Sequence, residues 1–380
     1  MTVGDEVVKM EGHLAVRMVR NDAAAFERLL VEVARTVQRR EVSAETILVD
    51  VFNINRTLKF IDAVWQASGI ELDVNSFYLW PTLRDLAGAM ADGSYRNVPK
   101  RIRIRQGTAP ETLVVFAGGA SCFLEMKDFV NALAFDGTVY GMALTPFGRP
   151  AATPAVIADE VAACLAELDA SGFAPPYRFV GYSFGGLVAL ELSRALAARG
   201  VGVDFLALVD SPQSEHAWPL RIWLSFAAGR LLSRGGQAPA TGPEEPSSEP
   251  SKMQRGSRLA RYRRTLRRLA FRFLSPKTES YPTFVPQWQG GYPPAYDLAA
   301  RQLLRMKGLF RPSRYEGPLV FYRTEGGSPV DCDPKLIWES YLPAAEWVDV
   351  SGNHQTITIG RHARALAADV SRRLAAMKKA

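Results

Sequence analysis

From residue 112 to the end, the chain alternates short β-branched, apolar runs with longer stretches of helical periodicity. This alternation predicts a parallel sheet with helices on both faces, because consecutive parallel strands need a crossover connection. The expected strands are 113–118, 138–144, 177–183, 203–210, 318–325 and 346–352. The expected helices are 122–134, 154–170, 184–199, 334–341 and 361–377.

One long segment, about 212–310, interrupts the alternation and is too long for a plain loop in a compact domain. Its middle, 235–250, is rich in Pro, Ser and Glu and is expected to be disordered. A basic helix is expected at 257–274, because ten basic residues and no acidic one lie between Lys252 and Lys277. Since the whole chain carries +7, the remainder is slightly acidic, and the positive charge belongs to this segment.

The pattern of the N-terminal part of the chain predicts a separate, smaller unit. Apolar residues recur at helical spacing over 23–40, over about 54–67 and again from residue 81, which indicates an all-α bundle ending near residue 93. The stretch 94–111 is polar and basic, contains two prolines and is predicted to be a linker. The expected organisation is therefore a helical domain at 1–93, a linker at 94–111 and an α/β domain at 112–380.

Composition narrows the class of protein. With 47% hydrophobic and 22% charged residues the chain is an ordinary globular protein. Three cysteines and four histidines are too few and too scattered for a disulfide framework or a zinc site, so we expect a reduced, metal-free, cytoplasmic protein. We predict no export signal and no transmembrane helix, since no stretch reaches about 18 uncharged apolar residues.

The strongest chemical signal is a G-x-S-x-G motif at 181–185, placed between a predicted strand and a predicted helix. In that context the central Ser183 sits on a tight turn and presents its hydroxyl at the carboxyl edge of the sheet, as a nucleophile does. The alternative is a glycine-rich strand–helix turn of a nucleotide site. It is disfavoured because no G-x-G-x-x-G and no Walker lysine accompanies the motif.

A nucleophilic serine requires a base and an orienting acid. His354, just past the last predicted strand, is the expected base. Asp210 ends the strand that follows the serine's helix and is the favoured acid, while Asp331, after the next strand, is the alternative. Either aspartate could instead only cap a turn or a helix.

Acyl transfer also requires hydrogen-bond donors for the oxyanion. We expect one from the backbone N–H of Phe184, directly after the nucleophile, and the other from Gly119, in the loop after the first strand of the sheet. The alternative for Gly119 is a plain strand-to-helix turn. We predict no metal site and no cofactor site.

These motifs resemble the type I thioesterase domains that end polyketide synthases and nonribosomal peptide synthetases. The resemblance rests on FVGYSFGG, LALVDSP, VSGNH and the insertion at 212–310, and covers about 112–378. It implies an α/β-hydrolase with a long helical lid. The family's serine takes an acyl chain from a phosphopantetheine arm, and water or an internal nucleophile releases the chain. In chain-terminating members the acid corresponds to Asp210, whereas stand-alone editing thioesterases place it near Asp331.

The N-terminal unit is similar to an acyl or peptidyl carrier domain at 69–72 (GIEL) and 80–83 (WPTL). Carrier domains attach phosphopantetheine to a serine that opens the second helix. Here 52–58 reads FNINRTL, with no serine, and Thr57 is poorly placed. We therefore expect a degenerate carrier that bears no phosphopantetheine. The alternative is an unrelated three- or four-helix bundle.

The resemblance implies a chain-releasing thioesterase that receives its substrate in trans, from a separate acyl- or peptidyl-carrier protein or from coenzyme A. Both are acidic, so the basic segment could steer them. A nucleic-acid partner is not expected because no recognition fold accompanies the charge, and a membrane partner is disfavoured. The alternatives are a general carboxylesterase or lipase with the same triad, and a docking protein whose two domains are inactive.

Overall fold

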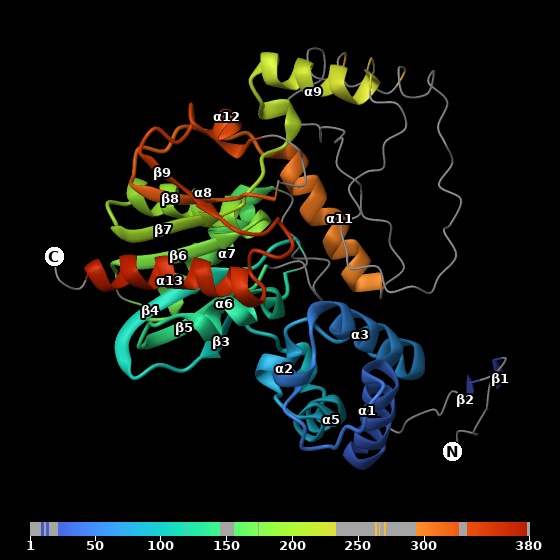
Figure 1. The fold of residues 1–380 in the computed structure, drawn as a ribbon. Coiled ribbons are helices and arrows are strands. Elements are labelled where there is room, and N and C mark those ends of the chain that lie inside the picture. Colours follow the sequence, from blue (N-terminus) through green and yellow to red (C-terminus); the bar gives the residue numbers. More distant parts are fainter. Residues whose placement is uncertain are drawn as a thin grey trace.

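The computed structural model describes residues 22–119, 121–144, 156–173, 175–232, 294–326 and 333–377, together with 9–10, 13–14, 263, 266 and 270 (Figure 1). Residues 9–10 and 13–14 pair as the two-residue strands β1 (Lys9–Met10) and β2 (His13–Leu14). The disordered stretch predicted at 235–250 lies outside the described residues. So does the basic helix predicted at 257–274, apart from Arg263, Leu266 and Ala270.

A seven-stranded sheet forms the centre of the larger unit, in the order β3-β5-β4-β6-β7-β8-β9. All neighbouring pairs are parallel except β3 with β5 at one edge. The strands are β3 (Arg101–Arg105), β4 (Ala109–Phe116), β5 (Gly137–Met142), β6 (Tyr177–Tyr182), β7 (Val203–Val209), β8 (Leu319–Thr324) and β9 (Ala345–Val350).

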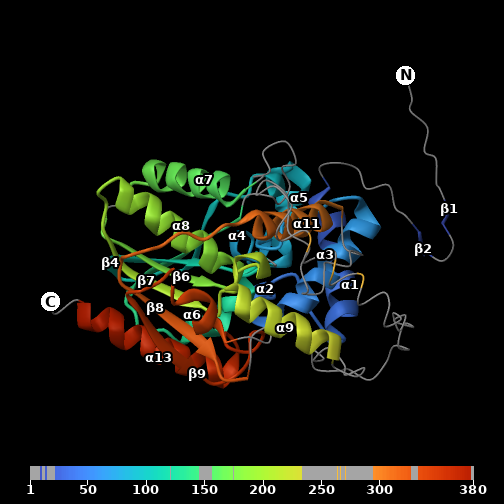
Figure 2. The same cartoon turned by 90° about the horizontal axis from the view of Figure 1, so that it is seen from above.

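Helices cover both faces of this sheet, as Figure 2 shows from above. α7 (Ile157–Ala170) and α8 (Phe184–Ala198) lie on one face, and α6 (Lys127–Ala132) and α13 (Gly360–Met377) lie on the other. Successive strand side chains alternate between two cores: Val114 belongs to the cluster under α7 and α8, Val115 to the cluster under α6 and α13. The prediction of a parallel sheet between two helical layers is confirmed.

The segment 94–111 is not a linker. It contains the 3-10 helix η1 (Ser94–Arg96), all of β3 and the beginning of β4. Ile102 is 1% exposed, and the Arg105 guanidinium donates to the carbonyls of Val130, Leu133 and Phe135. The prediction failed because it weighed basic residues and prolines, whereas the alternating RIRIR at 101–105 is the pattern of a strand with one buried face.

Among the described residues before the sheet, five α-helices form what we call the helical unit: α1 (Ala23–Gln38), α2 (Leu48–Val51), α3 (Ile54–Ser68), α4 (Ser76–Leu79) and α5 (Leu83–Asp92). Capping side chains define where three of these helices begin. The side chains of Asp22 and Asn53 accept hydrogen bonds from backbone N–H groups at the start of α1 and α3, and Thr82 forms a capping box at the start of α5. The rings of Phe52, Phe60 and Phe77 meet edge to face at its centre.

The insertion at 212–310 contributes η4 (Glu215–Ala217), α9 (Leu220–Leu232) and α11 (Pro294–Leu309) among the described residues. Two further short helices are η2 (Phe123–Met126) and α12 (Pro334–Trp338). α11 runs from beside the helical unit toward α12 (Figure 1). The core of the helical unit is continuous with the larger unit, because Cys122, Leu124 and Tyr296 are buried in the same cluster as Phe77.

Lys100 forms a buried ion pair, and a variant that removes this pair tests whether the segment 94–111 is an integral part of the fold. The Lys100 ammonium lies 2.5 Å from the Glu160 carboxylate, which is fully buried, and also donates to the Ala143 carbonyl. Because Lys100→Met leaves a buried carboxylate without this cation, we expect a loss of about 3 kcal/mol in the free energy of unfolding, measured with urea.

The matched control is Arg199→Met, which breaks an exposed pair with Asp169 at 3.3 Å. We expect that variant to lose less than about 1 kcal/mol, because exposed pairs are screened by solvent. Equal small losses in the two variants would contradict an integral role for residue 100.

Candidate active site

Ser183 occupies the turn between β6 and α8 with a left-handed backbone, φ 53°. Two glycines make this turn possible, because a Cβ on Gly181 would lie 2.5 Å from the Gly186 Cα, and one on Gly185 would lie 2.3 Å from the Ala117 carbonyl oxygen. The Ser183 N–H donates to the Val209 carbonyl at 2.9 Å, which ties the turn to the neighbouring strand. The hydroxyl thus projects at the carboxyl edge of the sheet.

Three side chains from three strand ends form one hydrogen-bonded chain. Ser183 Oγ lies 3.0 Å from His354 Nε2, and His354 Nδ1 lies 2.7 Å from Asp210 Oδ2. Asp210 is fully buried at the end of β7, and its N–H donates to the Tyr322 carbonyl of β8 at 2.9 Å. This arrangement can deprotonate the hydroxyl through the imidazole, while the carboxylate orients the ring and stabilises its charged form.

The structure therefore brings Ser183, His354 and Asp210 together, while Asp331 lies outside the described residues. His354 is fixed from its backbone as well, because the Tyr182 hydroxyl donates to its carbonyl at 2.5 Å. Phe184 is the first residue of α8, so its N–H belongs to the helix N-terminus beside the serine, where backbone donors lack carbonyl partners within the helix.

The loop after β4 carries the second expected donor, Gly119, which is exposed. Its neighbour Gly118 is buried, and a Cβ there would lie 2.9 Å from the Glu125 carboxylate and 3.0 Å from the Tyr182 ring. A Cβ on Gly119 would meet nothing within 4 Å. The close packing that requires glycine in this loop is therefore at Gly118, and Gly119 follows it as the exposed position.

Two polar side chains that contact this loop, those of Glu125 and Tyr182, were not predicted from the sequence. Glu125 accepts the Gly118 N–H at 3.1 Å, and burial raises the pKa of its carboxyl from 4.5 to about 7. Burial also raises the pKa of the Tyr182 phenol well above its usual value, with the Glu125 and Asp210 charges adding to the effect. Their only signal in the sequence is their place within or just after the two glycine-containing turns.

The two ends of the insertion meet close to the acid. Ser214 Oγ donates to the Lys307 carbonyl of α11 at 2.5 Å, which joins that helix to the stretch after β7. Burial lowers the pKa of Lys307, and the negative charges of Glu215 and Asp210 oppose that change. A cationic side chain of the insertion therefore lies within electrostatic range of Asp210, which the periodicity of this segment did not predict.

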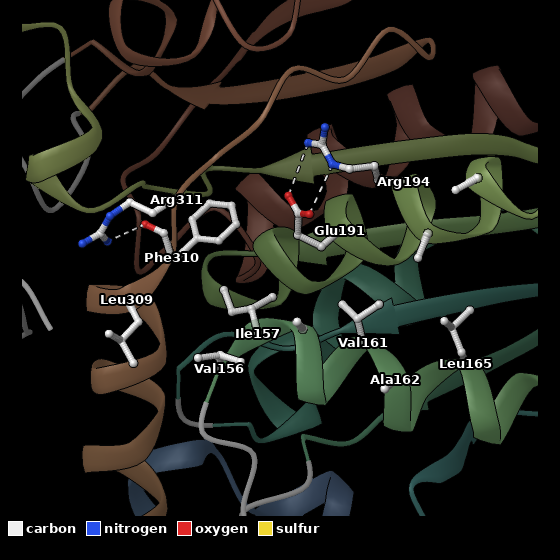
Figure 3. Close-up of a pocket in the computed structure, with 13 residues that line it drawn as sticks. Val156, Ile157, Val161, Ala162, Leu165, Glu191, Arg194, Leu309, Phe310 and Arg311 are labelled. Carbon is white, nitrogen blue, oxygen red and sulfur yellow. Dashed lines mark hydrogen bonds and ion pairs between the residues drawn. The ribbon is translucent and has the colours of Figure 1, made fainter. Parts of the chain in front are cut away.

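A separate surface pocket of about 560 Å³ lies between α7, α8 and the end of α11 (Figure 3). Ile157, Val161 and Leu165 give it an apolar wall, and the paired Glu191 and Arg194 lie along its α8 side. None of the three hydrogen-bonded site residues lines it. We therefore do not assign the acyl chain to this pocket.

No group of three or more His, Cys, Asp or Glu side chains in the described part of the chain could hold a metal ion. Among the same residues, none of the helices is long and apolar enough to span a membrane.

Comparison with known proteins gives a family match and several relatives. Residues 112–224 match the family model "Thioesterase domain". The chain is 28% identical over 158 residues to a probable non-canonical nonribosomal peptide synthetase, CymA, of Salinispora arenicola, and 26% identical over 221 residues to the vanchrobactin synthetase VabF of Vibrio anguillarum. These alignments cover 41% and 54% of this chain but only 2% and 8% of the relatives, so the chain spans a small part of their length.

Among solved structures, the chain is similar to holo-AB3403, a four-domain nonribosomal peptide synthetase bound to AMP and glycine, with a TM-score of 0.50 and 16% identity. That match covers 97% of this chain and 27% of the other, so the likeness in fold includes the helical unit.

The fold and the serine, histidine and aspartate at its edge define a serine hydrolase of the α/β-hydrolase class. Within that class, residues 112–224 match the thioesterase domain family, and the relatives that the chain resembles are nonribosomal peptide synthetases and polyketide synthases.

The raised pKa of Glu125 predicts a pH-dependent stability. The folded state binds this proton more tightly than the unfolded chain, so its contribution is complete below about pH 4.5 and is lost as the pH rises through about 7. Glu125→Gln keeps an acceptor for the Gly118 N–H but cannot titrate. We expect the free energy of unfolding of the wild type to fall, relative to the variant, by on the order of 2 kcal/mol between about pH 5 and pH 8.

The measurement is urea unfolding of both proteins across that pH range. Subtracting the free energy of unfolding of the variant from that of the wild type removes the contributions of the other titrating groups. One of these is Asp73, whose pKa is raised by burial to about 6. A difference that stays constant with pH would contradict the assignment to Glu125.

Proposed function

We propose that this protein releases an acyl, polyketide or peptidyl chain from a carrier-protein thioester through an acyl-Ser183 intermediate. The observation that carries the proposal is the Ser183–His354–Asp210 chain, at 3.0 and 2.7 Å, beside the N-terminus of α8. Release then occurs by hydrolysis or by cyclisation, according to which nucleophile attacks the acyl-enzyme.

Each residue has a defined role in this reaction. Ser183 Oγ attacks the thioester carbonyl while His354 Nε2 takes its proton, and Asp210 stabilises the resulting imidazolium. The N–H groups of Phe184 and Gly119 bind the oxyanion. The C–S bond then breaks, and His354 returns the proton to the leaving thiolate. In the second half, His354 deprotonates water or an internal hydroxyl or amine, and Ser183 leaves as the alcohol.

A general carboxylesterase or lipase would use the same triad, so the alternatives differ in how substrate arrives. The similarity to peptide synthetases, over 41% and 54% of this chain in the two alignments, favours a carrier-borne thioester. A docking protein with two inactive domains is disfavoured, because the three side chains lie at hydrogen-bond distance with the serine on its strained turn.

We further propose that the helical unit is a degenerate carrier without phosphopantetheine. Asn53 caps α3 and Ile54 opens it, where a carrier has its modified serine. The nearest hydroxyl, that of Thr57, is 1% exposed and donates to the Asn53 carbonyl at 2.9 Å. An attachment enzyme has no accessible nucleophile in this turn, so the substrate arrives in trans, on a separate acidic carrier that the basic stretch between Lys252 and Lys277 attracts.

A cytoplasmic location is part of the same proposal. It agrees with the two described cysteines, Cys122 and Cys164, which are both buried free thiols. No nucleic-acid or membrane partner is proposed.

Incubation with acyl-pantetheine thioesters of several chain lengths tests the reaction. We expect turnover, and a covalent acyl adduct on Ser183 by mass spectrometry of a rapidly quenched sample. Ser183→Ala should abolish the adduct and lower turnover on the order of 10⁴-fold or more, because the residual catalysis of triad enzymes comes only from binding and oxyanion stabilisation.

The matched oxygen esters separate the alternatives. A preference for the oxygen ester, with no adduct from any thioester, would reject the thioesterase and favour the carboxylesterase.

Co-expression with a broad-specificity phosphopantetheinyl transferase tests the degenerate carrier. We expect an unchanged intact mass, while a carrier protein of known reactivity, expressed alongside, gains the phosphopantetheine group. A modified species of this chain would overturn the proposal and identify the attachment residue by peptide mapping.

A further inference from the structure

We infer that Asn75 of the helical unit is a positioning residue for the loop after β4, and that the helical unit serves the reaction as a fixed support of the oxyanion donor. The inference rests on the proposed function, because it takes Gly119 in that loop as a donor to the oxyanion. It assigns a task to a unit that has lost the residue a carrier needs.

The contacts of Asn75 carry the inference. Its Nδ2 donates to the Ser121 carbonyl at 2.8 Å, and its Oδ1 accepts the Phe123 N–H at 2.9 Å. The side chain is 1% exposed, and its own N–H donates to Asp73 Oδ1 at 2.7 Å. One side-chain amide thus holds two backbone groups of the loop, 46 and 48 positions away in the sequence.

The point of attachment, Ser121, lies two residues after Gly119. Ser121 has a left-handed backbone, φ 53°, and its N–H donates to the Gly118 carbonyl at 2.9 Å, which closes a tight turn around Gly119. The Gly118 N–H, at the other end of the turn, is held by Glu125. The direction of the Gly119 N–H therefore depends on two anchors, Glu125 from the larger unit and Asn75 from the helical unit.

Further contacts show that the helical unit is packed onto this loop. The Cys122 thiol lies 3.4 Å from the Val74 carbonyl, and the Lys127 ammonium donates to the Val49 carbonyl at 2.6 Å. The rings of Tyr78 and Phe123 meet edge to face, 6.4 Å between centroids. A carrier that visits several sites needs a small, polar, separable interface, whereas these contacts continue the hydrophobic core of the unit.

Loss of the amide would act on catalysis through the loop. Without Asn75, the Ser121 carbonyl and the Phe123 N–H lose their partners in a buried place, and the strained turn can relax toward an ordinary conformation. The Gly119 N–H then no longer points to the position where the oxyanion develops. A donor misplaced by about 1 Å can cost on the order of 100-fold in rate.

The test compares Asn75→Leu, which keeps a similar volume without the hydrogen bonds, with Tyr78→Phe in the full-length protein. The Tyr78 hydroxyl is buried without a hydrogen-bond partner among the described residues, so its removal leaves the packing of the interface in place. With a small soluble thioester we expect kcat to fall about 100-fold in Asn75→Leu with KM within about twofold of wild type, and both constants unchanged in Tyr78→Phe.

A second readout is the rate at which a fluorophosphonate modifies Ser183, because the phosphonyl oxygen occupies the place of the oxyanion. We expect it to fall in parallel with kcat in Asn75→Leu. Thermal unfolding of each variant separates this effect from stability. A folded Asn75→Leu protein with unchanged kcat and unchanged labelling would overturn the inference, and so would a change confined to KM or to the unfolding temperature.

Two further outcomes have their own interpretation. If Asn75→Leu does not fold, Asn75→Ser leaves room for a bridging water and should show a smaller loss of kcat in the same direction; an unchanged kcat overturns the inference. If the wild type reacts with the fluorophosphonate but turns over no thioester, the proposed function fails while the labelling rates still decide the role of Asn75.

Discussion

The active site depends on the close approach of α8 to strands β4 and β6. That approach is possible only because Gly181 and Gly185 carry no Cβ, which would collide with backbone atoms at 2.3 to 2.5 Å. It holds Ser183 in a left-handed conformation, with its hydroxyl 3.0 Å from His354 Nε2. Because the strands are parallel, their carboxyl ends meet at this same edge, and Asp210 and His354 arrive beside the serine from β7 and from the loop after β9.

The same edge explains why the helical unit matters to the reaction. The loop that leaves β4 packs against Tyr182 and Gly185, which flank the serine turn, and is held by Glu125 and Asn75, one anchor from each unit. Cys122 and Leu124 complete the hydrophobic core of the helical unit, so the two units share one interior at this point. A domain that resembles a carrier in sequence is therefore bound to the enzyme through the loop next to the nucleophile.

Sequence periodicity located the strands and long helices within a few residues, since each parallel strand is a short apolar run bounded by turn residues. It failed at β3, where the arginines of RIRIR were interpreted as a solvated linker. In the structure, Arg105 donates to three carbonyls and Lys100 pairs with a buried carboxylate. Whether a basic residue is solvated depends on which distant groups face it, and the local pattern does not contain that information.

The sequence by itself determined the class of fold and singled out Ser183 as the candidate nucleophile, because a G-x-S-x-G turn between a strand and a helix can be recognised from neighbouring residues alone. It left the acid open between Asp210 and Asp331. The tertiary structure decided that Asp210 lies 2.7 Å from His354, and it placed Glu125, Lys307 and Asn75 around the site. These positions follow from contacts between residues far apart in the chain, which strand pairing and core packing create and local sequence does not encode.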